Sequence, residues 1–231
     1  MRTALRSLGW LFIAGGAVLA LYLVYSLYWT GIATSRAQEQ FLDDWVLEVG
    51  ELDDGGDPLL PVETEQPLSA VEVGEAVAAM QFHRPGSVEQ PVYEGPLFIV
   101  EGVNAESLSE GPGHYPGTAY PGEQGNFAVA GHRTTAGAPF YDLETLETGD
   151  EVHVTDRNGV RWVYEVVEQR IVDPSENYVL GQDPIGTGAP VLTLTTCHPR
   201  WSNRERLIVF AELVADQQQT ASAPATVTTA S

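Results

Sequence analysis

The chain has 231 residues, with 32 Asp and Glu against 11 basic residues, and its formal net charge is −21. This length suits one domain of ordinary size with additional segments. All of the basic residues are Arg, and the acidic residues outnumber them almost threefold. The composition therefore argues against a nucleic-acid-binding protein, which needs clustered Lys and Arg to contact phosphates.

The N-terminal segment predicts a membrane anchor. Arg2 and Arg6 precede an uncharged stretch, and residues 8–28 within it would form an apolar helix of roughly 30 Å at ~1.5 Å per residue. The alternative is a cleaved signal peptide, which would have a shorter apolar core and an A-x-A-like site. We predict that residues 1–36 are a cytoplasmic stub and a single transmembrane helix in the plasma membrane. Because the two arginines should stay in the cytoplasm, the rest of the chain should be extracellular.

Two further segments flank the predicted folded domain. Residues 37–74 are interpreted as a juxtamembrane segment and an acidic, Pro-rich stalk, with a short helix within Gln38–Glu48. Residues 216–231 carry no core-forming side chains and are predicted to be a disordered tail.

The segment between them, residues 75–215, has the pattern of a single all-β domain. Short apolar or alternating runs are separated by Gly, Pro, Asn and Asp, and no long helical period is present. Asn158 and Gly159 predict the turn of a β-hairpin, and residues 138–150 a short helix or turn. A domain of this kind is a sandwich or a barrel. The predicted strands are AVAAMQF, PLFIVEGV, NFAVAGH, EVHVTD, RWVYEVVEQRIV, VLTLTTC and RLIVFAELV.

Cys197 is the only cysteine, and it ends the apolar, β-branched run 191–197. Exported domains use cysteines in pairs, so a single one indicates an intermolecular bridge, a reactive thiol or a buried bystander. A reactive thiol needs help, because an unassisted cysteine with the reference pKa of ~8.5 is mostly protonated near neutrality. The sequence must then supply an imidazole and a donor for an oxyanion.

Five histidines are candidates for that imidazole. His132 follows an apolar strand and leads into a polar loop, which suits a site residue, although it could merely cap a turn. His198 adjoins the cysteine and would point to the opposite face of an extended strand. His114 lies in a Gly/Pro loop that could line a site. His83 and His153 fit alternating strand patterns and are interpreted as surface or packing residues.

Three arginines follow the cysteine: Arg200, Arg204 and Arg206. Arg204 and Arg206 share strand parity, so periodicity does not separate them. Arg206 directly precedes the last apolar run and is the better candidate for a rigidly held donor. The alternative is a solvated charge at a strand end.

These pieces together resemble the sortases, the membrane-anchored cysteine transpeptidases of Gram-positive bacteria. TLTTC ends at Cys197, AGHR contains His132, and Arg206 opens the final strand, as in the family pattern T-L-x-T-C followed by Arg. GPGHYPGTAYPGEQGNFAVAGHRTT and TLTTCHP further resemble the class E housekeeping sortases of actinobacteria. The resemblance spans about residues 75–215. It implies an all-β, sortase-like closed barrel of about seven or eight strands with short helices.

The resemblance also implies a reaction. Cys197 would attack the Thr carbonyl of an L-P-x-T-G or L-A-x-T-G sorting signal, and Arg206 would stabilise the oxyanion. His132 would protonate the leaving Gly amine and then deprotonate an incoming amine. Thr196 and Tyr115 are predicted to bind substrate, Thr196 beside the nucleophile and Tyr115 from a Gly/Pro-stiffened loop.

The implied partners are secreted proteins with such a C-terminal sorting signal, a peptidoglycan precursor or another amine acceptor, and the membrane. No cofactor and no metal are predicted. The alternatives are a pilus-assembling sortase that uses a pilin lysine, an inactive barrel that only binds sorting peptides, and an L,D-transpeptidase. The last is disfavoured because Cys197 lacks a preceding Gly. A zinc site from Cys197, His198 and His132 would lack a fourth ligand.

Overall fold

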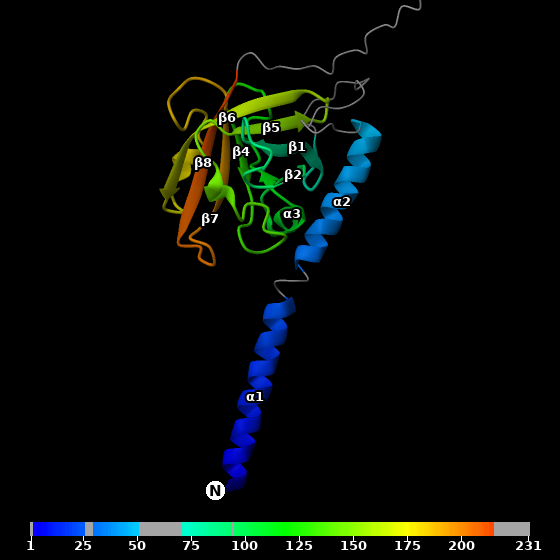
Figure 1. The fold of residues 1–231 in the computed structure, drawn as a ribbon, viewed down its shortest axis with the longest axis vertical. Coiled ribbons are helices and arrows are strands. Elements are labelled where there is room, and N and C mark those ends of the chain that lie inside the picture. The colour runs from blue at the N-terminus through cyan, green and yellow to red at the C-terminus, as the bar shows by residue number, and fades with distance from the viewer. Residues whose placement is uncertain (1, 26–29, 51–70, 94, 215–231) are drawn as a thin grey trace, which may run out of the picture.

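The computed structural model describes residues 2–25, 30–50, 71–93 and 95–214. Eight strands form a closed barrel in the order β1-β2-β3-β4-β7-β8-β6-β5 (Figure 1). The neighbours β2/β3 and β4/β7 are parallel, and the other pairs are antiparallel. The strands are β1 (Ala76–His83), β2 (Leu97–Glu101), β3 (Gly113–His114), β4 (Asn126–Ala130), β5 (Glu151–Asp156), β6 (Arg161–Val172), β7 (Val191–His198) and β8 (Glu205–Leu213).

The prediction of an all-β closed barrel is confirmed, and each of the seven predicted strands is present. The eighth, β3, is only two residues long and lies inside the Gly/Pro loop, so it has no periodicity to detect. The predicted hairpin turn joins β5 to β6, where Gly159 has a φ of 72°. The short helical elements are α3 (Ala105–Glu110), η3 (Leu143–Thr145) and η4 (Asn177–Leu180). Of these, η3 falls within the segment predicted as a short helix or turn.

The interior of the barrel is filled by apolar side chains from every long strand. Met80, Ile99, Val129 and Leu194 are 0% exposed and belong to one continuous cluster. Burying a side chain of this size contributes about 1.5–3 kcal/mol relative to leaving it exposed. This packed interior provides the rigid frame on which the ends of β4, β7 and β8 are held.

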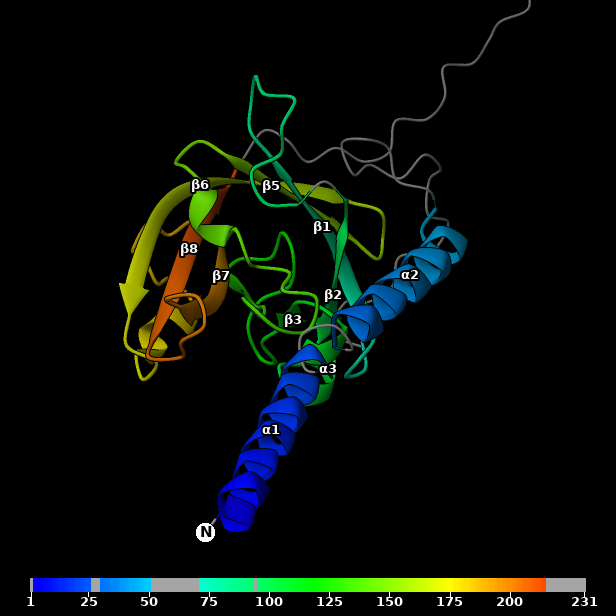
Figure 2. The ribbon, with the colours of Figure 1, turned by 60° about the horizontal axis from the view of Figure 1, so that its bottom comes forward.

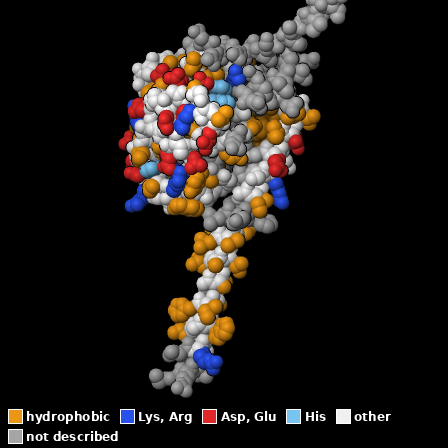
Figure 3. Space-filling view, in the orientation of Figure 1, with side chains coloured by type: hydrophobic (Ala, Val, Ile, Leu, Met, Phe, Trp, Pro, Cys, Tyr) orange, Lys and Arg blue, Asp and Glu red, His pale blue; other side chains and the backbone are white. Residues whose placement is uncertain are grey.

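The N-terminal region is two helices, α1 (Arg2–Val24) and α2 (Thr30–Glu48). In α1 the stretch Arg6–Val24 is long and apolar enough to cross a membrane, and none of it is buried. Figure 3 shows hydrophobic side chains around α1 and acidic side chains scattered over the barrel. The predicted span of residues 8–28 extends further than α1, which ends at Val24, and residues 26–29 lie outside the described residues.

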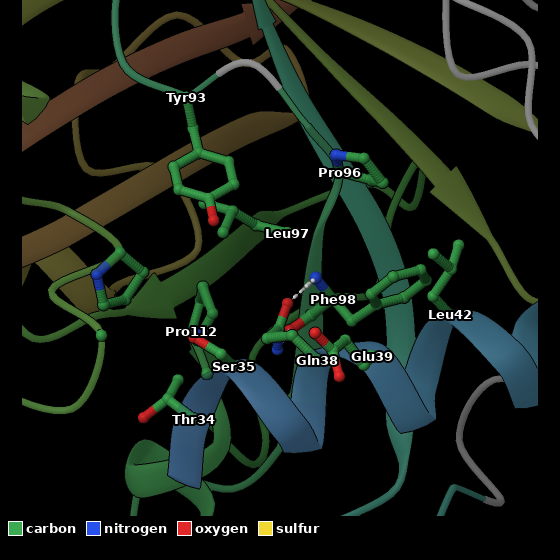
Figure 4. Close-up of a pocket in the computed structure, with 13 residues that line it drawn as sticks. Thr34, Ser35, Gln38, Glu39, Leu42, Tyr93, Pro96, Leu97, Phe98 and Pro112 are labelled. Carbon is green, nitrogen blue, oxygen red and sulfur yellow. Dashed lines mark hydrogen bonds between the residues drawn. The ribbon is translucent and has the colours of Figure 1, made fainter. Parts of the chain in front are cut away.

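The second helix, α2, is longer than the predicted Gln38–Glu48 and packs on the barrel beside β2 and α3 (Figure 2). Gln38 accepts a hydrogen bond from Phe98 N (2.8 Å) and donates to the carbonyls of Phe98 and Glu110 (3.0 Å each). Trp45 is 3% exposed, and its ring centroid lies 5.5 Å from that of Phe98. A cavity of about 310 Å³ remains between α2 and the barrel, where Gln38, Tyr93 and Pro112 face one another (Figure 4).

Most of the predicted stalk (residues 51–70) and all of the predicted tail lie outside the described residues. The conformations of both segments therefore stay predictions.

Candidate active site

The parallel register of β4 and β7 brings His132 and Cys197 to the same end of the barrel. Ala130 is paired with Thr195, and each functional candidate follows its paired residue by two positions. Two hydrogen bonds continue the contact with β7 past the end of β4: Gly131 N donates to Thr195 O (3.0 Å), and Thr196 Oγ1 donates to Gly131 O (2.7 Å). The histidine and the cysteine, which are far apart in the sequence, therefore emerge side by side.

Cys197 and Arg206 are directly opposite each other in the antiparallel pair β7/β8. Residues paired in this way project from the same face of a sheet, with Cβ atoms ~4.5–5.5 Å apart. The thiol is free and partly exposed. The Arg206 guanidinium donates through Nη1 to the carbonyls of Asn203 (3.1 Å) and Glu205 (3.0 Å), so the chain entering β8 holds it in place.

His132 is held by the loop that follows it. Its Nδ1 lies 3.2 Å from Thr135 Oγ1, and its carbonyl accepts a hydrogen bond from Phe140 N (3.1 Å). Burial of the imidazole lowers the pKa of His132 from its ordinary value, because desolvation disfavours the charged form. The neutral imidazole is therefore favoured near pH 7.

We expect the imidazole of His132 to titrate below pH 6.5 in a ¹H NMR titration of the folded protein. A lowered folded-state pKa means that the unfolded chain binds this proton more tightly. Protonation of His132 therefore destabilises the folded protein. The contribution of neutral His132 to folding stability is complete above the unfolded-state pKa, and it is lost as the pH falls from there through the lower folded-state pKa. His132→Gln identifies the resonance, and a midpoint at or above 6.5 would contradict the expectation.

Gly131 separates β4 from His132 and has no room for a side chain. A Cβ there would lie 2.4 Å from Cδ2 of Phe140, whose side chain is fully buried. We expect Gly131→Ala to lower the free energy of unfolding by about 1–3 kcal/mol, as overpacking does. Urea unfolding measures this loss. The control is Gly95→Ala, whose Cβ would meet its nearest atom, in Tyr93, at 3.8 Å, and an equal loss there would rule out the steric cause.

The two predicted substrate-binding residues occupy different positions. Tyr115 is partly exposed, and its hydroxyl lies 3.2 Å from Thr195 Oγ1 on the face of β7 that also bears Cys197. Thr196 is 3% exposed, and its hydroxyl is used by the Gly131 carbonyl. Tyr115 thus borders the site, whereas Thr196 ties β7 to the residue before His132.

The remaining histidines have structural surroundings. His114 is 0% exposed, with Nδ1 at 2.7 Å from Glu101 Oε2 and Nε2 at 3.0 Å from Thr118 Oγ1. His83 and His153 are stacked with ring centroids 4.2 Å apart, as their interpretation as packing residues expects. Among the described residues, no group of three His, Cys, Asp or Glu side chains is arranged to hold a metal ion.

The other two candidate arginines are placed differently from Arg206. Arg204 is exposed just before β8. Arg200 forms an ion pair with Asp142, with 2.9 Å between Nη2 and Oδ1, and its guanidinium lies over the ring of Tyr141. Register therefore separates Arg206 from Arg204, which strand parity alone could not do.

Sequence reasoning missed one residue, Arg133. It follows His132 directly, its side chain is 1% exposed, and its guanidinium reaches the carbonyl of Cys197. The motif AGHR contained it, but nothing in the pattern distinguishes a buried arginine from one that begins a polar loop.

Comparison with known proteins identifies the family of this chain. The Sortase domain family matches residues 86–214, which include the His132, Cys197 and Arg206 positions. This chain is a member of the sortase family. Sortase SrtE2 of Streptomyces coelicolor is 30% identical over 234 aligned positions, which cover 93% of this chain and 84% of the relative. Sortase SrtE1 of the same organism is 28% identical, and the match covers 96% of this chain and 60% of that longer protein.

Solved sortase structures share the fold of this chain, and one of them is a sortase E. Sortase E from Streptomyces avermitilis is 37% identical with a TM-score of 0.52, covering 62% of this chain and 91% of that one. A sortase D5 transpeptidase from Clostridium perfringens has a TM-score of 0.61 at 26% identity and covers 78% of this chain and 99% of that one. The protein is thus a class E-like sortase with the barrel of the family, and sortases are cysteine transpeptidases.

Proposed function

We propose that this sortase cleaves an LAxTG- or LPxTG-like sorting signal between Thr and Gly and transfers the protein to an amine of a cell-wall precursor. The observation that carries the proposal is the juxtaposition of three groups at one end of the barrel. Cys197 and Arg206 are directly paired, and His132 follows the neighbouring parallel strand. In support, sortase E1 of Streptomyces coelicolor, 30% identical with a TM-score of 0.53, was crystallised with a tripeptide in its active site.

The first half-reaction uses all three groups. The Cys197 thiolate attacks the Thr carbonyl carbon, and the carbonyl electrons move to oxygen. The C–N bond then breaks, and protonated His132 gives its proton to the departing Gly amine. The product is a thioester between Thr and Cys197. Since burial favours neutral His132, only part of the enzyme holds the reactive thiolate–imidazolium pair at a given moment.

The second half-reaction reverses these roles. The acceptor amine attacks the thioester carbonyl, and neutral His132 takes the proton from the amine nitrogen. Collapse of the tetrahedral intermediate forms the new amide and expels Cys197 as a thiolate. The net result exchanges one amide for another, so neither an oxidant nor a cofactor is needed.

Arg206 suits the oxyanion that forms in both halves. Its two backbone hydrogen bonds both use Nη1, which leaves Nε and Nη2 free of other partners in the described part of the chain. A permanent, forked cation that is already held by backbone carbonyls loses little orientational freedom in the transition state. Tyr115, from the loop after β3, is proposed to contact the sorting peptide, and Thr196 to fix the distance between β7 and His132.

The same proposal assigns the regions of the chain. Residues 1–36 contain the cytoplasmic stub and, in α1, the membrane anchor, with residues 30–36 belonging to α2, which docks on the barrel. Residues 37–74 form the juxtamembrane segment and acidic stalk, 75–215 the catalytic barrel and 216–231 a disordered tail. The exposed apolar surface of α1 supports an anchor, and Arg2 and Arg6 support a cytoplasmic N-terminus. Protease treatment of intact protoplasts tests this: the barrel should be degraded from outside.

The decisive experiment incubates the full-length protein in detergent with LAxTG and LPxTG peptides and an amine acceptor, and follows the products by mass spectrometry. The proposal expects a ligated product cut between Thr and Gly, and an acyl adduct on Cys197 when the acceptor is omitted. Binding of the peptide without cleavage would instead indicate an inactive binding barrel. A product formed only with a pilin-like lysine acceptor would indicate pilus assembly.

A further inference from the structure

Arg133 is a buried cation that contacts the backbone of the proposed nucleophile and follows His132 in the chain. Its Nη1 donates to the Cys197 carbonyl (3.2 Å) and lies 3.1 Å from Nδ1 of His198, while its Nε donates to the Tyr141 carbonyl (3.4 Å). Its Nη2 binds Glu144. One side chain therefore joins the segment after β4, the end of β7 and the η3 region.

This arrangement extends outward through a second arginine. Glu144 is also contacted by Arg200, which lies in the connection between β7 and β8 and binds Asp142 as well. The two carboxylates and two guanidiniums alternate in charge from the buried Arg133 to the surface. The β7–β8 connection is thus linked to the η3 region at two points, at His198 through Arg133 and at Arg200.

Burying a guanidinium is a poor way to stabilise a core. A buried ion pair often contributes no more than well-packed apolar side chains of similar volume, because both charges lose their hydration. The role of Arg133 is indicated by where its hydrogen bonds end rather than by how many it makes. Two of them end on Cys197 and its neighbour His198, and the arginine itself adjoins His132.

We propose that Arg133 is a positioning residue that holds the end of β7 against the His132 segment and thereby sets the geometry of the Cys197–His132 pair. Arginine has only donors, so Nδ1 of His198 must accept the hydrogen bond, and the His198 proton belongs on Nε2. This gives His198 a role that its position beside the nucleophile did not explain: it anchors the chain just past Cys197.

The kinetic consequences rest on the proposed function and are tested with Arg133→Met and Arg133→Lys in the full-length protein. Loss of alignment should lower kcat of peptide ligation about 10- to 100-fold, because small misplacements of reacting groups are costly, while KM changes less than about twofold. Lysine keeps the charge but cannot reach all of the partners at once, so Arg133→Lys should fall between wild type and Arg133→Met.

The matched control is Arg157→Met. Arg157 also pairs with two carboxylates, Glu48 and Glu75, but at the β5–β6 turn, and its loss should leave kcat within twofold. If Arg133→Met does not fold, Arg133→Lys and Glu144→Gln carry the comparison, since Glu144 is partly exposed.

A spectroscopic arm needs no substrate. In ¹⁵N-histidine-labelled protein at pH 8, wild-type His198 should show a protonated Nε2 and an unprotonated Nδ1, and folded Arg133→Met should lose this single tautomer. A wild-type tautomer and wild-type kcat in folded Arg133→Met would overturn the inference. If wild type forms no ligated product, the proposed function fails, and the His198 tautomer alone then decides the role of Arg133.

Discussion

Cys197→Ala should reduce ligation of a sorting peptide to an amine by at least about 10⁴-fold, since loss of a nucleophile removes the covalent route altogether. The chain has no second cysteine that could substitute. The thiol lies partly exposed at the end of β7, outside the packed interior, so the variant should keep its fold and its melting temperature within a few degrees.

The measurement is intact-mass analysis with and without acceptor. Wild type without acceptor should accumulate a thioester adduct, and Cys197→Ala should show none while still binding the peptide. Cys197→Ser is a useful companion, because it keeps the size and a hydroxyl, which is a far weaker nucleophile near neutrality. Ligation by Cys197→Ala above the uncatalysed rate would disprove the assignment of the nucleophile.

Arg206→Ala should lower kcat about 10²- to 10³-fold, the range observed when one oxyanion donor is removed. The physical reason is the direct pairing of Arg206 with Cys197, which puts both side chains on one face of the sheet and the cation beside the proposed nucleophile. Arg206→Lys should restore only a minor part of the loss, since an ammonium cannot both reproduce the backbone contacts and present a planar fork.

Arg204→Ala is the control for that experiment. Arg204 shares strand parity with Arg206 and carries the same charge, but it is exposed and lies before β8 begins. Its removal should change kcat less than twofold. The reverse result, with loss in Arg204→Ala and not in Arg206→Ala, would mean that the loop rearranges on binding and that the wrong arginine was assigned.

Much of the fold could be predicted because strand signals are local. Runs such as VLTLTTC and RLIVFAEL combine β-branched residues with clear boundaries, and Asn158–Gly159 defines a hairpin without tertiary information. The strand β3 was not predicted, because two residues are too few to show an alternating hydrophobic pattern and β3 is defined only by its pairing with β2 and β4. The helix α3 was not predicted, because its six residues are too few to show an amphipathic pattern, although Asn104 caps its N-terminus.

The candidate site was predictable to the extent that it lies at strand ends in a specific motif. Cys197 and His132 could be named from sequence, but their proximity depends on the parallel pairing of β4 with β7, which no local signal encodes. Arg133 could not be predicted, because its neighbours Glu144, Tyr141 and His198 come together only through the fold. A buried charge of this kind is decided by tertiary context.

The docking of α2 limits the distance between the catalytic barrel and the proposed membrane anchor. Gln38 and Trp45 fasten α2 to the barrel, and α2 begins at Thr30, shortly after α1 ends at Val24. In the proposed topology, with α1 as the membrane anchor, the distance between the membrane and the catalytic barrel is therefore limited by the five residues between the helices, at most about 20 Å when fully extended. Val49 and Val71, on either side of the acidic stretch, both pack against the barrel, so lengthening that stretch would not extend this distance. For a sortase anchored in this way, the reach of the active site from the bilayer would depend on the length of the chain between the two helices.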